Sequence, residues 1–358
     1  MIRALLLVHL LLQMQVAGPP VTPEVSTLLQ SGSDAESRNE FDRAIADFRK
    51  AADLDPSSTV VLLRLGDAYV KKRDYAAAIS PLKRAAELSP DSLPIHQLLG
   101  YALLSEGYAA DAIPHLQIAH DSGALGIAQL QADHPAEAIV NLGVALSRNP
   151  GDPDLLYYLS RAGSALSSQS EDKLLLSFPQ NTRSHEVLGQ HYYAMKMLPE
   201  AIKEYQQALA QRPDLPGLRI ELGQIYAARS EWAQAEEQFR EETKLQSGNA
   251  EAAYRLGDTL LQEGKMTEAA ETLHRSDLLR PDMPETLYSL ARATIVSNPA
   301  SAELALNRVI EIEKQTPLAG QAYLLLAGIH RKQGKTEQAM REMAEYHRIQ
   351  TLTSRGRE

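Results

Sequence analysis

The sequence predicts an all-α protein built from about ten repeated pairs of helices. Of the 358 residues 44% are hydrophobic and only 5% aromatic, and most of the apolar residues are Leu and Ala, which favour helices over strands. Glycines, alanines and prolines recur at a spacing of 34 residues. Within each period, the apolar residues follow the spacing of one helix face.

The repeat is marked by residues of one type at a constant spacing. Pro56 and Pro90 are 34 residues apart, and glycines and alanines keep the same interval in two series each. Three residue types in a single phase indicate a structural repeat rather than chance. The series are Gly32, Gly66 and Gly100; Gly189, Gly223 and Gly257; Ala44, Ala78 and Ala112; and Ala201, Ala235 and Ala269.

The segment Thr59–Ser92 shows how one period predicts two helices around a short turn. Leu65 and Tyr69 fall on one face of the first helix, with Gly66 beside them. A glycine within a helix costs about 1 kcal/mol relative to alanine, which is tolerable where a second helix approaches closely. Pro90 ends the second helix. The residue next to the turn is large in most periods: Phe41, Tyr75, Leu198, Trp232 and Met266.

The order L-G-x-x-Y, then A-x-x-x-[FYL], then Pro, at a 34-residue period, resembles the tetratricopeptide repeat (TPR) family over about 330 of the 358 residues. The resemblance implies an α-solenoid, a right-handed superhelix whose concave groove is lined by the first helix of each unit. Because one repeat cannot bury its apolar face alone, stability comes from stacked neighbours, and we expect the array to behave as one elongated domain.

The repeats are expected to occupy most of the chain, in two regular blocks joined by an irregular stretch. The expected parts are a TPR array at 25–353, regular at 25–118, irregular at 119–181 and regular at 182–353, and a tail at 354–358.

The irregular stretch departs from the regular pattern of the array. In the irregular stretch the glycine spacing falls to 26 residues, from Gly100 to Gly126. The unit Pro153–Asn181 is predicted to hold two helices around a Ser-rich turn, SALSSQSEDK. The last unit is predicted at Gly320–Thr353.

The N-terminus has the composition of a secretory signal. Arg3 precedes an apolar run at Ala4–Ala17, which small residues and prolines follow. That run is shorter than the roughly 20 residues of a membrane-spanning helix. We therefore expect a cleavable signal peptide at 1–18 and a linker at 19–24, with an uncleaved membrane anchor as the alternative. The expected location is periplasmic or secreted, with membrane contact only through this segment if it stays uncleaved.

Charge and composition argue against several classes of function. The net charge is −10, so a nucleic acid duplex would be repelled, and we expect no nucleic acid partner. The absence of cysteine excludes disulfides, thiol catalysis and cysteine-based zinc sites.

No sequence motif indicates catalysis or a cofactor. Gly334-Lys335-Thr336 lacks the first glycine of a phosphate loop, since position 329 is Ile329, and it falls on a turn between two predicted helices. The ten histidines lack the i, i+4 spacing of paired helical metal ligands. We therefore predict that the protein is not an enzyme, with no cofactor, no metal site and no catalytic residues.

In the TPR family, ligand-facing residues lie three and two before the glycine and one and four after it. These positions hold tyrosines and arginines in the central and C-terminal units, and both types are enriched at binding hot spots. A tyrosine three before the glycine is also ordinary for the repeat scaffold, so a structural role is the alternative for Tyr157, Tyr254 and Tyr288. The predicted partner-binding residues are Tyr157, Tyr158, Arg161, Tyr193, Tyr254, Arg255, Tyr288 and Arg292. The N-terminal units offer Leu63, Arg64, Asp67, Gln97, Leu98 and Tyr101.

The leading hypothesis is a non-catalytic scaffold that binds a peptide or protein partner in the concave groove, outside the cytoplasm. Its arginines would meet acidic groups of the partner. The alternative is an accessory subunit of an envelope enzyme or of a polysaccharide export or secretion machinery. An enzyme built on the array is a third class, for which the sequence offers no site.

Overall fold

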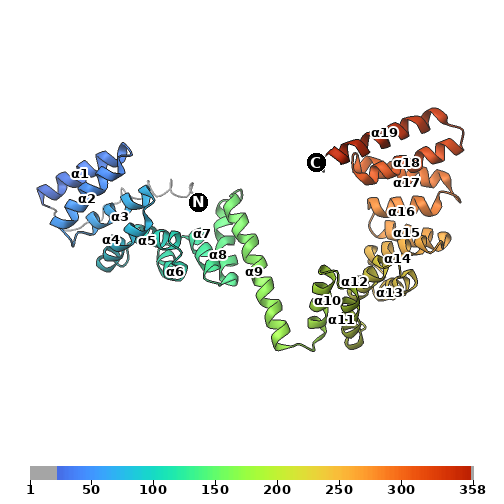
Figure 1. Cartoon of the computed structure of the whole chain (residues 1–358), viewed down its shortest axis with the longest axis horizontal. Helices are drawn as coiled ribbons and strands as arrows, with labels where there is room; N and C mark the ends of the chain where they lie inside the picture. Colours follow the sequence, from blue (N-terminus) through green and yellow to red (C-terminus); the bar gives the residue numbers. More distant parts are fainter. Residues whose placement is uncertain (1–21, 356–358) are drawn as a thin grey trace. The chain divides into compact units, whose positions relative to one another are not determined.

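The structure is a computed structural model that describes residues 22–355, in which every regular element is an α-helix (Figure 1). The predicted all-α fold of stacked helical repeats is therefore confirmed. The predicted signal peptide at 1–18 and the last three residues of the predicted tail lie outside the described residues. The right-handed superhelix stays a prediction.

The chain forms two compact units that divide between Asp172 and Lys173. The sequence predicted one elongated domain, and the division instead falls within a long helix, α9 (Pro153–Ser177). The first unit also holds α1 (Pro23–Ser37), α2 (Phe41–Leu54), α3 (Thr59–Lys72), α4 (Tyr75–Leu88), α5 (Leu93–Ser105), α6 (Ala109–Ile118), α7 (Ser122–Gln131) and α8 (Pro135–Arg148).

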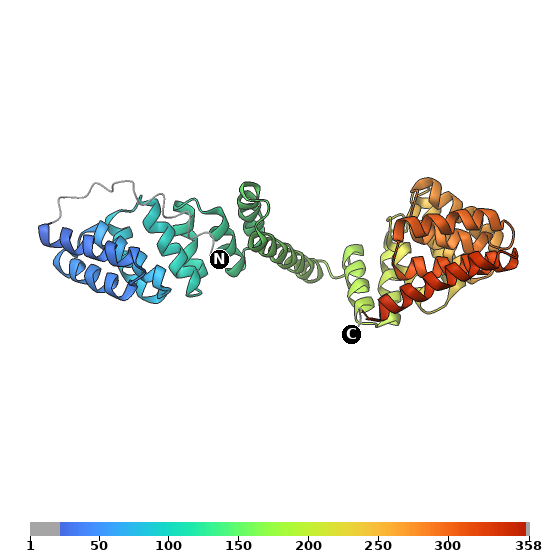
Figure 2. The same ribbon diagram turned by 90° about the horizontal axis from the view of Figure 1, so that it is seen from above.

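The second unit continues the pattern of paired helices after the end of α9. Successive helices contact each other from α1 to α8 and from α10 to α19, and they stack as pairs joined by short turns (Figure 2). The helices are α10 (Thr182–Ala194), α11 (Leu198–Gln211), α12 (Leu218–Ala228), α13 (Trp232–Leu245), α14 (Ala250–Gln262), α15 (Met266–Leu279), α16 (Pro284–Thr294), α17 (Pro299–Glu313), α18 (Pro317–Lys332) and α19 (Thr336–Arg355).

Local sequence fixes the turn inside each pair. Between α3 and α4, Arg73 takes a left-handed conformation with φ of 64°, which ends the first helix. The Asp74 side chain then accepts a hydrogen bond from the Ala77 backbone N–H at 3.2 Å and caps the second helix. The large residues predicted next to the turns begin the second helices: Phe41 in α2, Tyr75 in α4, Leu198 in α11, Trp232 in α13 and Met266 in α15.

The prediction of two helices in Pro153–Asn181 is wrong, because α9 runs unbroken through the Ser-rich segment. That segment contains no glycine or proline to end a helix. Its serines bond back to the helix instead: the Ser164 hydroxyl donates to the Ser160 carbonyl at 3.1 Å, and the Ser170 hydroxyl donates to the Leu166 carbonyl at 2.7 Å.

Three boundaries also differ from the predicted ones. Helix α1 begins at Pro23, inside the predicted linker, and α19 continues to Arg355, past the predicted end of the array. Helix α18 begins at Pro317, three residues before the predicted Gly320. The Thr316 hydroxyl accepts from the Ala319 N–H and caps this helix, and proline is favoured at the first helical position.

One contact recurs in seven of the helical pairs. A glycine in the first helix faces a large side chain of the second helix, sixteen residues later, that is at most 1% exposed. A Cβ atom on any of these glycines would lie 2.4–2.9 Å from that side chain. The pairs are Gly32–Phe48, Gly66–Leu82, Gly100–Leu116, Gly126–Leu142, Gly189–Tyr205, Gly223–Phe239 and Gly257–Leu273.

We expect Gly223→Ala to lower the free energy of unfolding by about 1–3 kcal/mol, because the Phe239 ring must move away from the added methyl group. Gly328→Ala makes the same change inside α18, where the methyl meets nothing within 4 Å. This control should be neutral or stabilising by up to about 1 kcal/mol. Urea denaturation followed by circular dichroism compares the two variants, and equal effects would contradict the assigned contact.

Two stacked histidines join α5 and α6 in the first unit. Their ring centroids are 5.0 Å apart, and the Nδ1 atoms of His96 and His115 lie 2.8 Å apart. The Nε2 atom of His96 lies 2.8 Å from the Pro90 carbonyl, which can only accept, so Nε2 carries the proton. Nδ1 of neutral His96 is then the acceptor and Nδ1 of His115 the donor.

We expect acid to weaken the first unit through this pair. Burial is the main cause that lowers the pKa of His115 below its ordinary value of 6.5, and His96 and Lys83 lower it further against the opposing effect of Asp111. Because the unfolded chain takes up this proton first, the stability is complete above pH 6.5 and is lost as the pH falls through the lowered value.

The thermal midpoint should therefore fall by a few degrees more for the wild type than for His115→Gln between pH 7.5 and pH 5. The variant isolates this pair from the other titrating groups. An equal fall in both proteins would show that the pair does not respond to acid.

Candidate functional site

The first helices of the second unit carry a row of polar and aromatic side chains that are only partly buried. Neighbouring first helices contact each other directly, α12 with α14, α14 with α16, and α16 with α18. We name eight of the half-buried side chains at the predicted ligand positions the first-helix face: Glu186, Tyr193, Glu221, Tyr254, Arg255, Asp258, Tyr288 and Arg292.

On α14, a tyrosine and an arginine are held beside each other. The Arg255 guanidinium carbon lies 5.5 Å from the centroid of the Tyr254 ring, and its Nε donates to Glu251 Oε1 at 2.7 Å. Burial, with the charge of Asp258, raises the pKa of Tyr254 to about 12. The Tyr254 phenol is therefore neutral at physiological pH and can both donate and accept a hydrogen bond.

Asp258 links α14 to the next first helix. The buried Ser289 hydroxyl donates to Asp258 Oδ1 at 3.0 Å, and Arg292 Nη1 lies 3.9 Å from the same oxygen. Burial raises the pKa of Tyr288, one turn before Arg292. The carboxylate thus orients Arg292 while leaving other guanidinium N–H groups open to a ligand.

The remaining predicted residues lie elsewhere. Tyr193 is on α10, with the Lys196 ammonium 5.9 Å from its ring centroid. Tyr157, Tyr158 and Arg161 lie together on α9 in the first unit: the tyrosine rings meet edge to face at 5.3 Å, and Arg161 Nη1 donates to the Tyr157 hydroxyl at 3.2 Å. The structure therefore gathers three predicted residues on α9 and the other five in the second unit.

The partner-binding residues predicted for this face are tyrosines and arginines, and its acidic residues were not among them. Glu186 lies three before Gly189, Glu221 two before Gly223, and Asp258 one after Gly257, so the same positional rule would have found all three. In the first unit the corresponding positions are filled by internal contacts. Lys71 Nζ lies 2.8 Å from the buried Asp67 carboxylate and 3.3 Å from Glu36.

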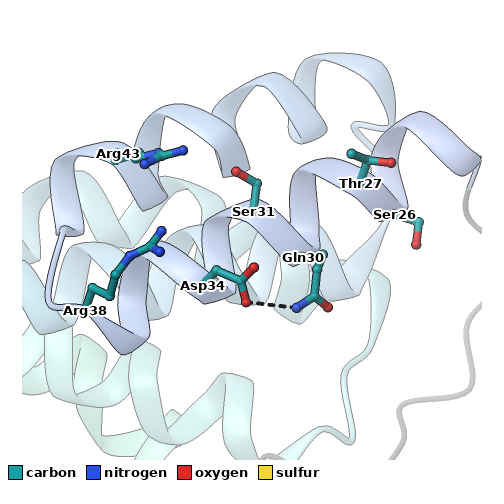
Figure 3. Close-up of a pocket in the computed structure, with 7 residues that line it drawn as sticks. All are labelled: Ser26, Thr27, Gln30, Ser31, Asp34, Arg38 and Arg43. Carbon is teal, nitrogen blue, oxygen red and sulfur yellow. Dashed lines mark hydrogen bonds between the residues drawn. The ribbon is translucent and has the colours of Figure 1, made fainter.

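A separate surface hollow of about 510 Å³ lies along α1 at the start of the first unit (Figure 3). Its polar groups bond to each other or to nearby residues: Gln30 donates to Asp34 at 2.9 Å, and the Ser31 hydroxyl donates to Asp47 at 2.7 Å. Arg38 and Arg43 both pair with Glu40. It is lined by Ser26, Thr27, Gln30, Ser31, Asp34, Arg38 and Arg43.

The described chain holds no cluster of three or more His, Cys, Asp or Glu side chains arranged to bind a metal ion. Among residues 22–355, none of the helices has both the length and the apolar character that crossing a bilayer requires.

We expect Asp258→Ala to lower the free energy of unfolding by about 1–2 kcal/mol, because the buried Ser289 hydroxyl loses its acceptor. Asp258→Asn keeps an oxygen at this position and should cost less. Urea denaturation measures both. Equal losses would show that the hydrogen bond to Ser289 does not contribute to stability.

Comparison with known proteins agrees with this architecture. The family described as tetratricopeptide repeat matches residues 29–93 and 220–284, and one described as TPR repeat matches 189–229. No curated protein matches the sequence.

Solved structures with low sequence identity are also similar. A MamA structure from Desulfovibrio magneticus RS-1 is 14% identical, with 48% of this chain and 96% of that chain covered and a TM-score of 0.45. The APC/C hetero-tetramer Cut9–Hcn1 is 13% identical, with 92% and 88% covered and a TM-score of 0.44. Yeast Tom70 is 14% identical, with 91% and 92% covered and a TM-score of 0.40. Likenesses of this size identify no partner. The family matches do identify the repeat, and this chain contains tetratricopeptide repeats in both of its compact units.

Proposed function

We propose that this protein is a non-catalytic scaffold that binds a peptide or protein partner through the first-helix face of its second unit. The observation that carries the proposal is the placement of Arg255 and Arg292 on the first-helix face. Each is half-buried, lies near an acid of its own chain and stands next to, or one turn from, a half-buried tyrosine. Side chains that are ordered before binding lose less entropy when a ligand arrives.

The chemistry of the face suits a peptide. Neutral phenols offer a broad apolar surface with one hydrogen-bonding end, and guanidinium groups offer several donors to carboxylates or carbonyls. We further propose that the protein acts outside the cytoplasm. This rests on the apolar N-terminal sequence that follows Arg3.

The test is a selection of random twelve-residue peptides, displayed on phage, against the full chain. Recovered peptides should bind the double variant Tyr254→Ala/Arg292→Ala at least tenfold more weakly, because it removes one aromatic and one cationic anchor. The matched control is Tyr108→Ala/Arg84→Ala, which removes the same residue types from exposed positions in the first unit and should change affinity by less than twofold.

Fluorescence polarisation gives the affinities, and circular dichroism verifies that both variants are folded. The proposal would be contradicted by a loss of peptide affinity in the control variant alone. Equal affinity of the wild type and both variants would also contradict it.

A further inference from the structure

Helix α9 packs within the first unit through one side only. Ala162, the only buried residue of this helix, lies in one apolar cluster with Ala138 and Leu142 of α8. Further along the same side, the Gln169 amide donates to Asp133 Oδ1 at 2.8 Å. The helix therefore presents its other side to the surroundings of the first unit.

A row of side chains follows this other side at intervals of four and three residues, which is the spacing of one helix face. Tyr157 is 55% exposed, Glu171 is half-buried, and the other three members are exposed. We name this row the outer face of α9: Tyr157, Arg161, Ser164, Ser168 and Glu171.

The outer face carries a positive group near one end and a negative group near the other. Arg161 Nη1 donates to the Tyr157 hydroxyl at 3.2 Å, and the guanidinium has further N–H groups that can reach a carboxylate. The Ser167 hydroxyl donates to Glu171 Oε1 at 3.1 Å, and a carboxylate can accept several hydrogen bonds at once. An arginine from another molecule can therefore bind Glu171 in a two-pronged ion pair.

The outer face is complementary to itself when its direction is reversed. Arg161 and Glu171 each lie five residues from Leu166, and Ser164 and Ser168 each lie two residues from it. Antiparallel pairing about this centre sets Arg161 of each copy against Glu171 of the other. Parallel pairing would set like charges against each other, which is unfavourable. A surface that matches its own reverse fits a second copy of the same chain, related by a two-fold axis.

We infer that the protein forms a homodimer in which the outer faces of two α9 helices pack antiparallel. Exposed ion pairs mainly fix the orientation of an interface and add little affinity. The apolar contact comes from Tyr157, whose counterpart in this register is Leu175 of the second copy. Because each copy contributes a single helix, the interface is smaller than a standard one, and we expect a reversible dimer in the micromolar range.

This inference does not depend on the proposed function, because the first-helix face of the second unit contains none of these residues. It gives Tyr157 and Arg161, two of the predicted partner-binding residues, a partner of their own.

The experiment is sedimentation velocity of the full chain over a range of concentrations. The wild type should change from monomer to dimer as the concentration rises. Arg161→Glu and Glu171→Arg should each weaken the dimer at least tenfold, because each variant sets like charges against each other at both ends of the interface. An equimolar mixture of the two variants should dimerise as the wild type does, since each copy then supplies the charge that the other needs.

The matched control is Arg84→Glu, which reverses the same charge at an exposed position on α4 of the first unit. It should dimerise within twofold of the wild type, and circular dichroism verifies that every variant is folded. A wild type that stays monomeric would overturn the inference. Association retained by both single variants, an equal loss in the control, or a mixture that associates no better than its components would overturn it as well.

Discussion

The architecture depends on one close contact, that between a glycine of each first helix and a large side chain sixteen residues later. The side chain occupies the space where a Cβ atom would lie, so the two helices approach closely and bury it almost completely. This contact links the two helices of a pair, fixes which face of the first helix is buried, and leaves the opposite positions available for binding.

The same contact differs in one of the seven pairs. At Gly189 the large side chain is Tyr205, whose ring serves the core as Phe239 does in the next pair. The hydroxyl extends beyond the ring and forms no hydrogen bond with any described residue. Among the seven pairs, this one alone has a polar atom on the side chain that faces the glycine.

Much of the fold follows from the sequence because its determinants are local or periodic. Gly66 and Tyr75 mark a close contact and a turn without any knowledge of distant contacts. The unbroken helix α9 was not predicted, because the Ser-rich segment was interpreted as a turn. Serine lowers helix propensity only slightly, and its hydroxyl can bond within the helix. The candidate residues Tyr254 and Arg292 follow from a positional rule of the family, and their role in binding stays a prediction. The burial of Tyr205 depends on how three helices meet, which residue type alone does not reveal.

The most direct test of the account is amide hydrogen exchange of the full chain with and without a selected peptide. Binding at the first-helix face predicts slower exchange in α10, α12, α14 and α16, with α11, α13 and α15 changed less. Protection confined to the second helices, or to the first unit, would contradict the central claim that the first-helix face receives the partner.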